Sequence, residues 1–422
     1  MAAALRTRVA ARLDAEQAAD GQRQARVQEL IEQELDSDTQ AALREGRPVP
    51  DAAAEARIAR TVRDSLVALG GFQRYLDDDQ VEDIVFNGCD VGYVTFSDGT
   101  KQRVDPVAGS DEELVELVRQ IAATAGAEER RFDRGQPALN LQLPDGSRLF
   151  AVQALCPRPS VTIRRHRFLT VTLAELRELG TVDERVEDLL AALVRARRNI
   201  VISGGTRVGK TTMLRALAQQ IGPLERLVTV EDTFELFLDR DPAHPDAMPL
   251  QARERNIEGV GEVSMAELVR MALRMSPDRL IVGEARGGEV LPMLMAMSQG
   301  NDGSLSTVHA SSSRGALTRL ATYTLQAGEQ LSVEAANLLI AGAVHIVVHL
   351  GWDRPGRQGT RVVTSVREIT TADGHHVATN ELFAPGPDGR ARPAVPPTDT
   401  LHQDLVAAGA PGNLFAAGVG GR

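Results

Sequence analysis

Between residues 183 and 370, apolar residues alternate between two spacings. Short runs rich in aliphatic residues are typical of buried strands, and they occur at Ile200–Ile202, Arg226–Val230, Arg279–Val282 and Leu305–His309. Between these runs, apolar residues recur at the spacing of a helix face, over Met265–Met275 and Glu289–Gln299. The alternation predicts an α/β domain whose parallel sheet carries helices on both faces.

Residues 51–165, which precede this domain, also contain strand-like and helix-like apolar spacings, but the two do not alternate regularly. We expect two helices, over residues 51–75 and 111–126, and strand segments at Val81–Gly88, Val91–Thr100, Leu139–Leu155 and Val161–Arg165. A Pro-Asp-Gly turn divides Leu139–Leu155 into two strands. This part of the chain therefore predicts a smaller α+β domain.

Three further segments flank or join the two predicted domains. Residues 1–50 carry sparse aliphatic positions among Ala, Gln, Glu and Arg, which predicts a helical and mobile N-terminal extension. Residues 166–182 are predicted to be a linker, and residues 371–422, rich in Gly, Pro and Ala, a loosely packed C-terminal tail. The predicted domain boundaries are thus 1–50, 51–165, 166–182, 183–370 and 371–422.

Composition and charge narrow the class of function. With 47 Lys and Arg against 58 Asp and Glu, the net charge of −11 argues against direct binding of nucleic acid. The two cysteines, Cys89 and Cys156, lack metal-ligand spacing and fit a reducing compartment. The best apolar run, Leu338–Leu350, is interrupted by two histidines, so no membrane span is predicted. We expect a cytoplasmic protein that touches membranes only through its partners.

The strongest chemical motif, GGTRVGKTT, directly follows the predicted strand Ile200–Ile202 and opens a predicted helix. Strand, glycine loop and helix in this order indicate a phosphate-binding loop for ATP. Its glycines let backbone N–H groups surround phosphate oxygens, Lys210 supplies a compact cation, and the Thr211 hydroxyl is a predicted Mg²⁺ ligand. The residues assigned to nucleotide binding are Gly204, Gly205, Thr206, Gly209, Lys210, Thr211 and Thr212. Apart from Lys101, Lys210 is the only lysine in a chain that otherwise uses arginine.

Side chains suited to catalysis end three of the other predicted strands. Glu284 follows Arg279–Val282, at the sheet edge where ligands of open α/β sheets bind. There it can hold the water shell of Mg²⁺ and accept a proton from the attacking water. Glu231, which ends another strand beside Asp232, is a second candidate to orient or activate water, and which carboxylate is the base stays open. His309, a residue type that is more often structural, is predicted to sense the γ-phosphate.

Arginines cluster in the smaller domain. A surface arginine is usually only solvated, but arginines beside an ATPase domain can neutralise γ-phosphate charge, in cis or from a neighbouring subunit. The candidates for this role are Arg130, Arg131, Arg148, Arg164 and Arg165. In the larger domain, Arg274 and Arg286 are weaker candidates.

Taken together, these motifs resemble those of the type II/type IV secretion ATPase family. GGTRVGKTT, VEDTFEL, DRLIVGEARGGE and GNDGSLSTVHA resemble its Walker A, Asp, Walker B and His boxes, in the same order. VEDIVFNG, RRFDRGQP, LPDGSRLFAV and VTIRRH resemble its N-terminal domain, and the nearest branch is similar to the CpaF-type ATPases of tight-adherence pilus systems. The resemblance covers about residues 55–370. The four-cysteine zinc motif of other branches is absent.

The resemblance implies a RecA-like P-loop ATPase domain and assigns roles to several residues. Lys210 and Thr211 would bind phosphate and Mg²⁺, Glu284 would be the Walker B carboxylate, and Arg131 and Arg148 would contact phosphate from the N-terminal domain. The protein would form a homohexameric ring at the inner face of the cytoplasmic membrane. ATP hydrolysis would power assembly, with retraction as an option, of a pilus through an inner-membrane platform protein.

Two other functions compete with this one. A conjugation-type type IV secretion ATPase has the same boxes, and the sequence discriminates poorly between it and a pilus motor. A nucleotide-gated scaffold would bind ATP with little hydrolysis. The presence of Glu231, Glu284 and His309 argues against the scaffold, because a scaffold would tolerate their loss.

Overall fold

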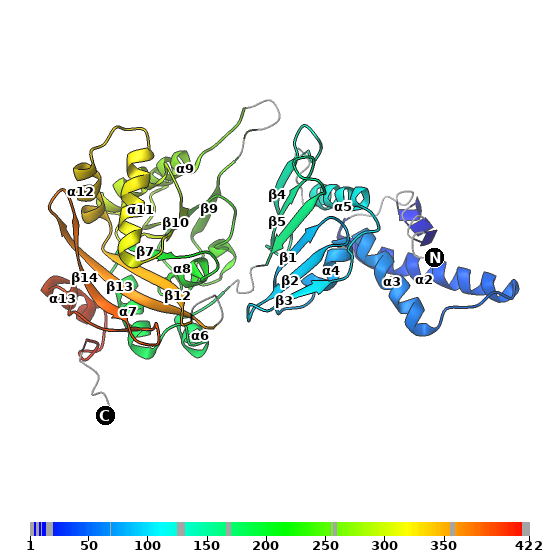
Figure 1. Cartoon of the computed structure of the whole chain (residues 1–422), viewed down its shortest axis with the longest axis horizontal. Helices are drawn as coiled ribbons and strands as arrows, with labels where there is room; N and C mark the ends of the chain where they lie inside the picture. The colour runs from blue at the N-terminus through cyan, green and yellow to red at the C-terminus, as the bar shows by residue number, and fades with distance from the viewer. Residues whose placement is uncertain are drawn as a thin grey trace. The chain divides into compact units, whose positions relative to one another are not determined.

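The computed structural model divides into two compact units, unit 1 over Met1–Arg167 and unit 2 over Phe168–Arg422 (Figure 1). It describes residues 4–5, 8–9, 11–13, 20–67, 69–124, 131–165, 170–253, 255, 260–354 and 359–415. Arg130 and residues 166–169 of the predicted linker lie outside these described residues. The two units are described separately.

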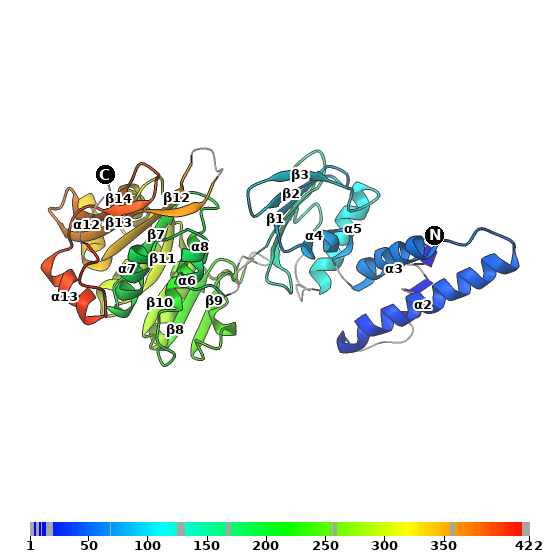
Figure 2. The same cartoon turned by 90° about the horizontal axis from the view of Figure 1, so that it is seen from below.

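Unit 1 contains a pair of helices and an antiparallel sheet. The helices α2 (Asp20–Arg44) and α3 (Ala52–Val67) lie side by side (Figure 2). Val27, Leu30 and Ile31 of α2 are fully buried. The sheet has the order β3-β2-β1-β6-β5-β4, and every neighbouring pair is antiparallel. The strands are β1 (Val81–Asn87), β2 (Gly92–Phe96), β3 (Lys101–Val104), β4 (Ala138–Gln142), β5 (Arg148–Val152) and β6 (Ser160–Arg164). Two further helices, α4 (Gln73–Leu76) and α5 (Asp111–Thr124), accompany them. The core of the sheet joins alternate strand residues to the apolar face of α5.

Unit 2 is built on a nine-stranded sheet of order β15-β14-β13-β12-β7-β11-β10-β8-β9. The strands from β12 to β9 in this order are parallel, whereas β13, β14 and β15 pair antiparallel. The strands are β7 (Ile200–Gly204), β8 (Leu227–Glu231), β9 (Ala247–Gln251), β10 (Arg279–Ala285), β11 (Leu305–His309), β12 (Ile346–Trp352), β13 (Arg361–Ala372), β14 (Val377–Pro385) and β15 (Ala391–Pro393). The α/β class is confirmed, but the sheet is mixed and not wholly parallel as predicted.

Helices cover both faces of this sheet, and each face has its own apolar core (Figure 1). One face packs against α6 (Leu173–Glu178), α7 (Glu184–Arg195), α8 (Lys210–Ala218) and α13 (Asp399–Ala407). The other packs against α9 (Met265–Ala272), α10 (Val290–Ser298), α11 (Ser313–Gln326) and α12 (Val333–Ala343). The predicted capping box of Ser264 and Glu267 is present at the start of α9.

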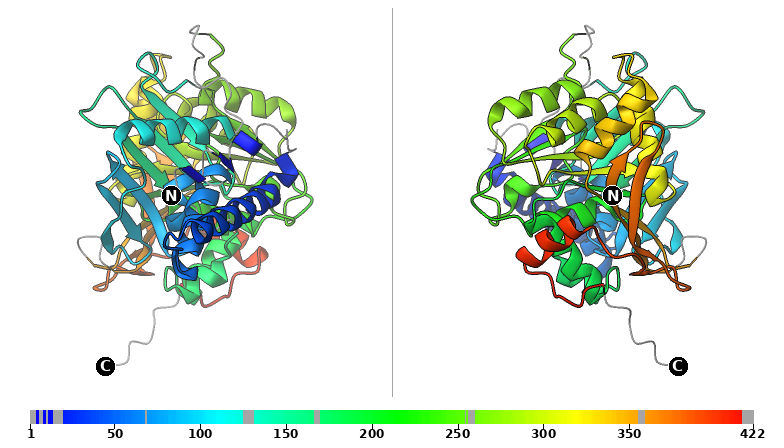
Figure 3. Two further views of the ribbon diagram at one scale, coloured as in Figure 1. Left: turned by 90° about the vertical axis from the view of Figure 1, so that its right-hand side faces the viewer. Right: turned by 90° about the vertical axis from the view of Figure 1, so that its left-hand side faces the viewer.

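The prediction of a loosely packed tail over residues 371–422 is wrong for the part of that segment that the structure describes. Leu382 and Phe383 on β14 and Leu401 and Leu405 on α13 are buried in the core that also contains residues of α7. The helix α13, red in Figure 3, packs against α7. The Gly- and Pro-rich composition reflects tight turns between these elements, such as the turn closed by Gly389 at a φ of 73°. Tertiary burial therefore outweighs the weak local preference of the segment.

The apolar run Leu338–Leu350 spans the end of α12 and the start of β12, with His345 and His349 at buried or half-buried positions. Among the described residues, we find no helix of the length and hydrophobicity that a membrane crossing requires.

Asn199, the residue before β7, forms side-chain hydrogen bonds that connect the start of this strand to neighbouring elements. Its buried Nδ2 atom donates to the carbonyl oxygens of Met297 and Ala343, at 3.0 and 2.7 Å. Its Oδ1 atom accepts hydrogen bonds from the backbone N–H groups of Gly303 and Ser304, at 2.9 and 3.0 Å. One amide side chain thus connects the start of β7 to α10, to α12 and to the turn before β11.

Candidate active site

The glycine loop between β7 and α8 has the backbone geometry of a phosphate cradle. Gly209 caps α8 with a φ of 91°, a left-handed conformation that disfavours residues with a Cβ. A Cβ on Gly204 would lie 2.7 Å from the carbonyl oxygen of Leu350, so only glycine fits beside β12. The N–H groups of the first turn of α8 point toward this loop, which favours an anion there.

Lys210 is buried, with 8% of its surface exposed, at the start of α8. Its Nζ atom donates to the carbonyl oxygen of Gly205 at 3.0 Å and lies 3.4 Å from that of Gly204. It also lies 3.2 Å from Nδ1 of His309 on β11. The lysine therefore points into the loop from which it would contact phosphates.

The remaining predicted loop residues line the same turn. Gly205 and Thr206 are exposed, and Thr211 and Thr212 are half-buried in the first turn of α8. A glycine cradle, a buried cation and a hydroxyl at the helix start fit the phosphates of ATP and a hydrated Mg²⁺ ion.

His309 links the loop to Glu284. Nε2 of His309 lies 2.6 Å from Oε1 of Glu284, which ends β10 beside β11. Because lysine can only donate, the neutral ring accepts from Lys210 through Nδ1 and donates to Glu284 through Nε2. Burial lowers the pKa of His309, which favours this neutral form, while the neighbouring Glu284 carboxylate opposes the shift. The structure thus brings together three residues that the sequence predicted as one site.

Arg286 occupies the other oxygen of Glu284. Its Nε atom donates to Oε2 of Glu284 at 2.6 Å, and its Nη1 atom lies 3.4 Å from Oδ2 of Asp232 at the end of the adjacent strand β8. Backbone N–H groups of Arg286 and Gly287 donate to the carboxylate of Glu289, which shapes the turn. Arg286, a weak candidate for phosphate contact in the sequence, is thus paired with two carboxylates.

Glu231 is placed differently from Glu284, because only 2% of its surface is exposed. Its Oε2 atom accepts hydrogen bonds from the N–H groups of Glu235 and Leu236, at 2.8 and 2.9 Å, and Oε1 accepts one from the Thr229 hydroxyl at 3.0 Å. Burial raises the pKa of Glu231 to about 7, although the two backbone donors act against the shift. The Glu231 carboxylate therefore fixes the position of the loop that follows β8 through these backbone hydrogen bonds.

Sequence reasoning missed two side chains that support this site. Arg215 on α8 donates to the carbonyl oxygen of Glu235 and lies 5.4 Å from the ring centroid of Phe237, so it holds the same loop as Glu231. His349 on β12 lies 2.8 Å, through Nδ1, from Oγ of Ser203 next to the glycine loop, and burial lowers its pKa to about 4. The interruption of an apolar run by His349 was the available signal for this residue.

The predicted N-terminal arginines lie in unit 1. Arg131 is exposed, and Arg148 is half-buried at the start of β5, where Nε donates to Oδ1 of Asn140 at 3.1 Å. Arg164 pairs with the buried Asp83 at 3.0 Å, and Arg165 contacts the carbonyl oxygen of Asp78. The phosphate-contact role of Arg131 and Arg148 stays a prediction.

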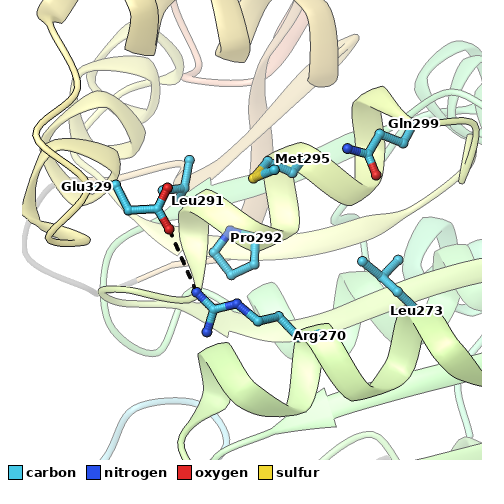
Figure 4. A pocket seen from close by; sticks show the side chains of 7 residues that line it. All are labelled: Arg270, Leu273, Leu291, Pro292, Met295, Gln299 and Glu329. Atoms are coloured by element: carbon cyan, nitrogen blue, oxygen red, sulfur yellow. Dashed lines mark ion pairs between the residues drawn. The ribbon is translucent and has the colours of Figure 1, made fainter.

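A surface groove of about 170 Å³ lies between α9 and α10 of unit 2. It is spanned by the ion pair of Arg270 and Glu329 at 4.0 Å (Figure 4). Its lining includes Leu291, Pro292 and Met295 but no residue of the glycine loop and neither Glu231 nor Glu284.

Comparisons with known proteins identify the family. A profile described as "Type II/IV secretion system protein" matches residues 76–361. A Mycobacterium tuberculosis protein whose name assigns it to conjugal transfer is 35% identical over 318 residues, which cover 73% of this chain and 87% of the relative. The type IV secretion system protein VirB11 of Brucella suis is 32% identical over 330 residues, 72% of this chain and 88% of the relative.

Among solved structures, the ATPase DotB of Yersinia pseudotuberculosis matches with a TM-score of 0.51 and 16% identity. The match covers 72% of this chain and 79% of that chain. At this identity, the similarity concerns the fold alone.

Proposed function

Since this chain belongs to the type II/IV secretion system ATPase family, we propose that it hydrolyses ATP to drive assembly of a tight-adherence pilus. The observation that carries the hydrolytic part is the contact of His309 with both Lys210 and Glu284, at 3.2 and 2.6 Å. A scaffold that binds ATP without hydrolysing it would not need the imidazole of His309 to link the phosphate-binding Lys210 to the half-buried carboxylate of Glu284. The scaffold alternative is therefore disfavoured.

In the proposed reaction, Glu284 accepts the proton of the attacking water. Glu284 is half-buried at the sheet edge beside Lys210 and His309, whereas Glu231 is only 2% exposed and binds the backbone of the loop after β8. We therefore assign Glu284 as the base and Glu231 as a positioning residue for the loop after β8. Neutral His309 would couple the γ-phosphate to Glu284. A phosphate that binds Lys210 and moves it would break the contact between Lys210 and Nδ1 of His309, whose Nε2 atom contacts Glu284.

The residues present also fit Mg²⁺. The Thr211 hydroxyl and, through water, the Glu284 carboxylate are the oxygen donors that would hold it. When bound, Mg²⁺ would neutralise charge on the phosphate oxygens. Lys210 adds a fixed positive charge from a buried position at the start of α8.

The assembly that we propose is a homohexamer at the inner face of the cytoplasmic membrane. Arg131 and Arg148 of unit 1 would contact phosphate, and nucleotide turnover would move an inner-membrane platform protein. Membrane contact would be through that partner alone. The conjugation-type alternative is kept, because the relatives with 35% and 32% identity are named for conjugal transfer and type IV secretion.

The direct test is Mg²⁺-dependent ATP hydrolysis by the purified chain, measured across protein concentration beside Glu284→Gln. We expect turnover per subunit to rise with concentration and to collapse in the variant. Turnover that is absent from wild type at every concentration, with and without a membrane partner, would contradict the motor.

A second experiment decides between pilus assembly and conjugation. The Lys210→Ala variant replaces the chromosomal copy, and surface pili are counted by electron microscopy while DNA transfer frequency is measured in matings. Loss of pili with unchanged transfer supports the pilus motor. Loss of transfer with normal pili supports the conjugation-type alternative.

A further inference from the structure

The sheet order indicates on which side of the glycine loop the nucleoside of ATP would lie. β7, which leads into the loop, has β11 on one side and β12 on the other. His309 ends β11, and Glu284 lies on β10, the next strand beyond it. Because His309 and Glu284 are the proposed contacts of the reacting phosphate on this flank, we expect the other end of the nucleotide to extend toward β12.

On that side, the hairpin of β12 and β13 carries an aromatic and cationic pair. Trp352 ends β12 directly opposite Arg361, the first residue of β13, and Cζ of Arg361 lies 5.4 Å from the Trp352 ring centroid. Cδ of Arg361 lies 3.8 Å from the point that a Cβ on Gly209 would occupy. Both side chains are half-buried. The pair therefore lies next to the phosphate cradle, on the flank opposite Glu284.

We propose that Arg361, stacked on Trp352, forms the surface that binds the purine base of the nucleotide. A planar guanidinium stacks on flat π-systems, and indole is the strongest partner for a cation among the aromatic side chains. The same contacts are available to a purine ring, which stacks on arginine and tryptophan. This inference rests on the proposed ATPase function. It adds that Arg361 makes the site bind a nucleotide more tightly than an inorganic polyphosphate.

Trp352 provides its own probe, because it is the one tryptophan of the chain. Its fluorescence is followed while ADP or inorganic tripolyphosphate is titrated in, and the binding of each ligand is measured independently by calorimetry. We expect ADP to change the emission and tripolyphosphate, which has no base, to leave it nearly unchanged. Equal emission changes with both ligands, or none with bound ADP, would overturn the proposal.

Variants separate the base contact from the phosphate contacts. Arg361→Ala should weaken ADP about tenfold and tripolyphosphate less than about twofold, with partial recovery in Arg361→Lys. Arg354→Ala, at an exposed position of the same hairpin, is the control and should change neither affinity. Equal losses for both ligands in Arg361→Ala would show that Arg361 acts on the loop and not on the base.

The same measurements separate the two hypotheses. If wild-type protein binds neither ADP nor tripolyphosphate, the proposed ATPase function fails. If ADP binds without a change in Trp352 emission and Arg361→Ala keeps its affinity, only the assignment of the base-binding pair fails.

Discussion

Nε2 of His309 lies 2.6 Å from Oε1 of Glu284, while Nδ1 of the same ring lies 3.2 Å from Nζ of Lys210. The imidazole can form both contacts while neutral, because one nitrogen donates and the other accepts. A change in the position of the lysine is therefore transmitted to the carboxylate through a single ring.

Removing this ring should reduce catalysis more than binding. We expect His309→Ala to lower kcat by about 10- to 100-fold while the Kd for ATP changes less than about threefold. Steady-state kinetics and calorimetry measure the two effects. A Kd that rises as much as kcat falls would mean that His309 serves mainly to hold the loop.

Glu284→Gln should separate hydrolysis from binding. The amide keeps the shape of the side chain but cannot accept the proton of water, so turnover should fall at least about 100-fold with ATP binding retained. The control is Glu334→Gln, at a half-exposed position on α12 with 49% of its side chain exposed. Full activity in Glu284→Gln would transfer the role of base to another group.

Lys210→Ala should abolish nucleotide binding, since it removes the buried cation of the loop. Lys101→Ala is a matched control, because Lys101 is exposed on β3 of unit 1 and lies over the Tyr93 ring at 4.7 Å. Equilibrium dialysis with labelled ATP measures both. ATP affinity that is unchanged in Lys210→Ala would contradict the assignment of the phosphate loop.

The raised pKa of Glu231 has a consequence for stability. Burial favours its protonated form, so its contribution to stability is full below the unfolded pKa of 4.5 and is lost as pH rises through about 7. From pH 5 to pH 8, wild type should lose roughly 2 to 3 kcal/mol of unfolding free energy relative to Glu231→Gln. Urea unfolding of both proteins across this range measures the difference, and a difference independent of pH would contradict the shift.

Asn199→Ala should destabilise unit 2 without touching the nucleotide. The substitution leaves two buried carbonyl oxygens and two buried N–H groups without their side-chain partner. We expect a loss of about 3 to 5 kcal/mol in unfolding free energy. Asn301→Ala, whose side chain donates to one carbonyl oxygen at 3.2 Å, should cost about 1 kcal/mol. Similar losses in the two variants would contradict the special position of Asn199.

The parts of the fold that follow from local pattern were predictable. β11 begins and ends where the apolar run Leu305–His309 does, and the glycine loop lies between β7 and α8 as its motif requires. The prediction of α/β class needed only the alternation of these spacings. Nucleotide-binding and catalytic candidates of unit 2 were also placed correctly relative to the strands, because the ends of parallel strands share one edge.

The C-terminal strands and the different roles of Glu231 and Glu284 were not predictable, because both depend on how the chain packs in three dimensions. β13 and β14 gain their stability by pairing with β12 and by burying residues such as Phe383, which composition does not reveal. Glu231 and Glu284 look alike in the sequence, since each ends an apolar strand. In the fold they differ in burial and in their donors, because the loop after β8 covers Glu231 and donates two backbone hydrogen bonds to it.

The position of β7 between β11 and β12 also bears on how the chain is made. Its two hydrogen-bonded neighbours begin at Leu305 and Ile346, more than 100 residues later than Ile200. During synthesis, the strand that leads into the glycine loop emerges from the ribosome long before either neighbour exists. Both of its edges stay unpaired over that interval, which makes them available to the wrong partners. Capacity to bind nucleotide should therefore arise late in translation, after β12 has left the ribosome.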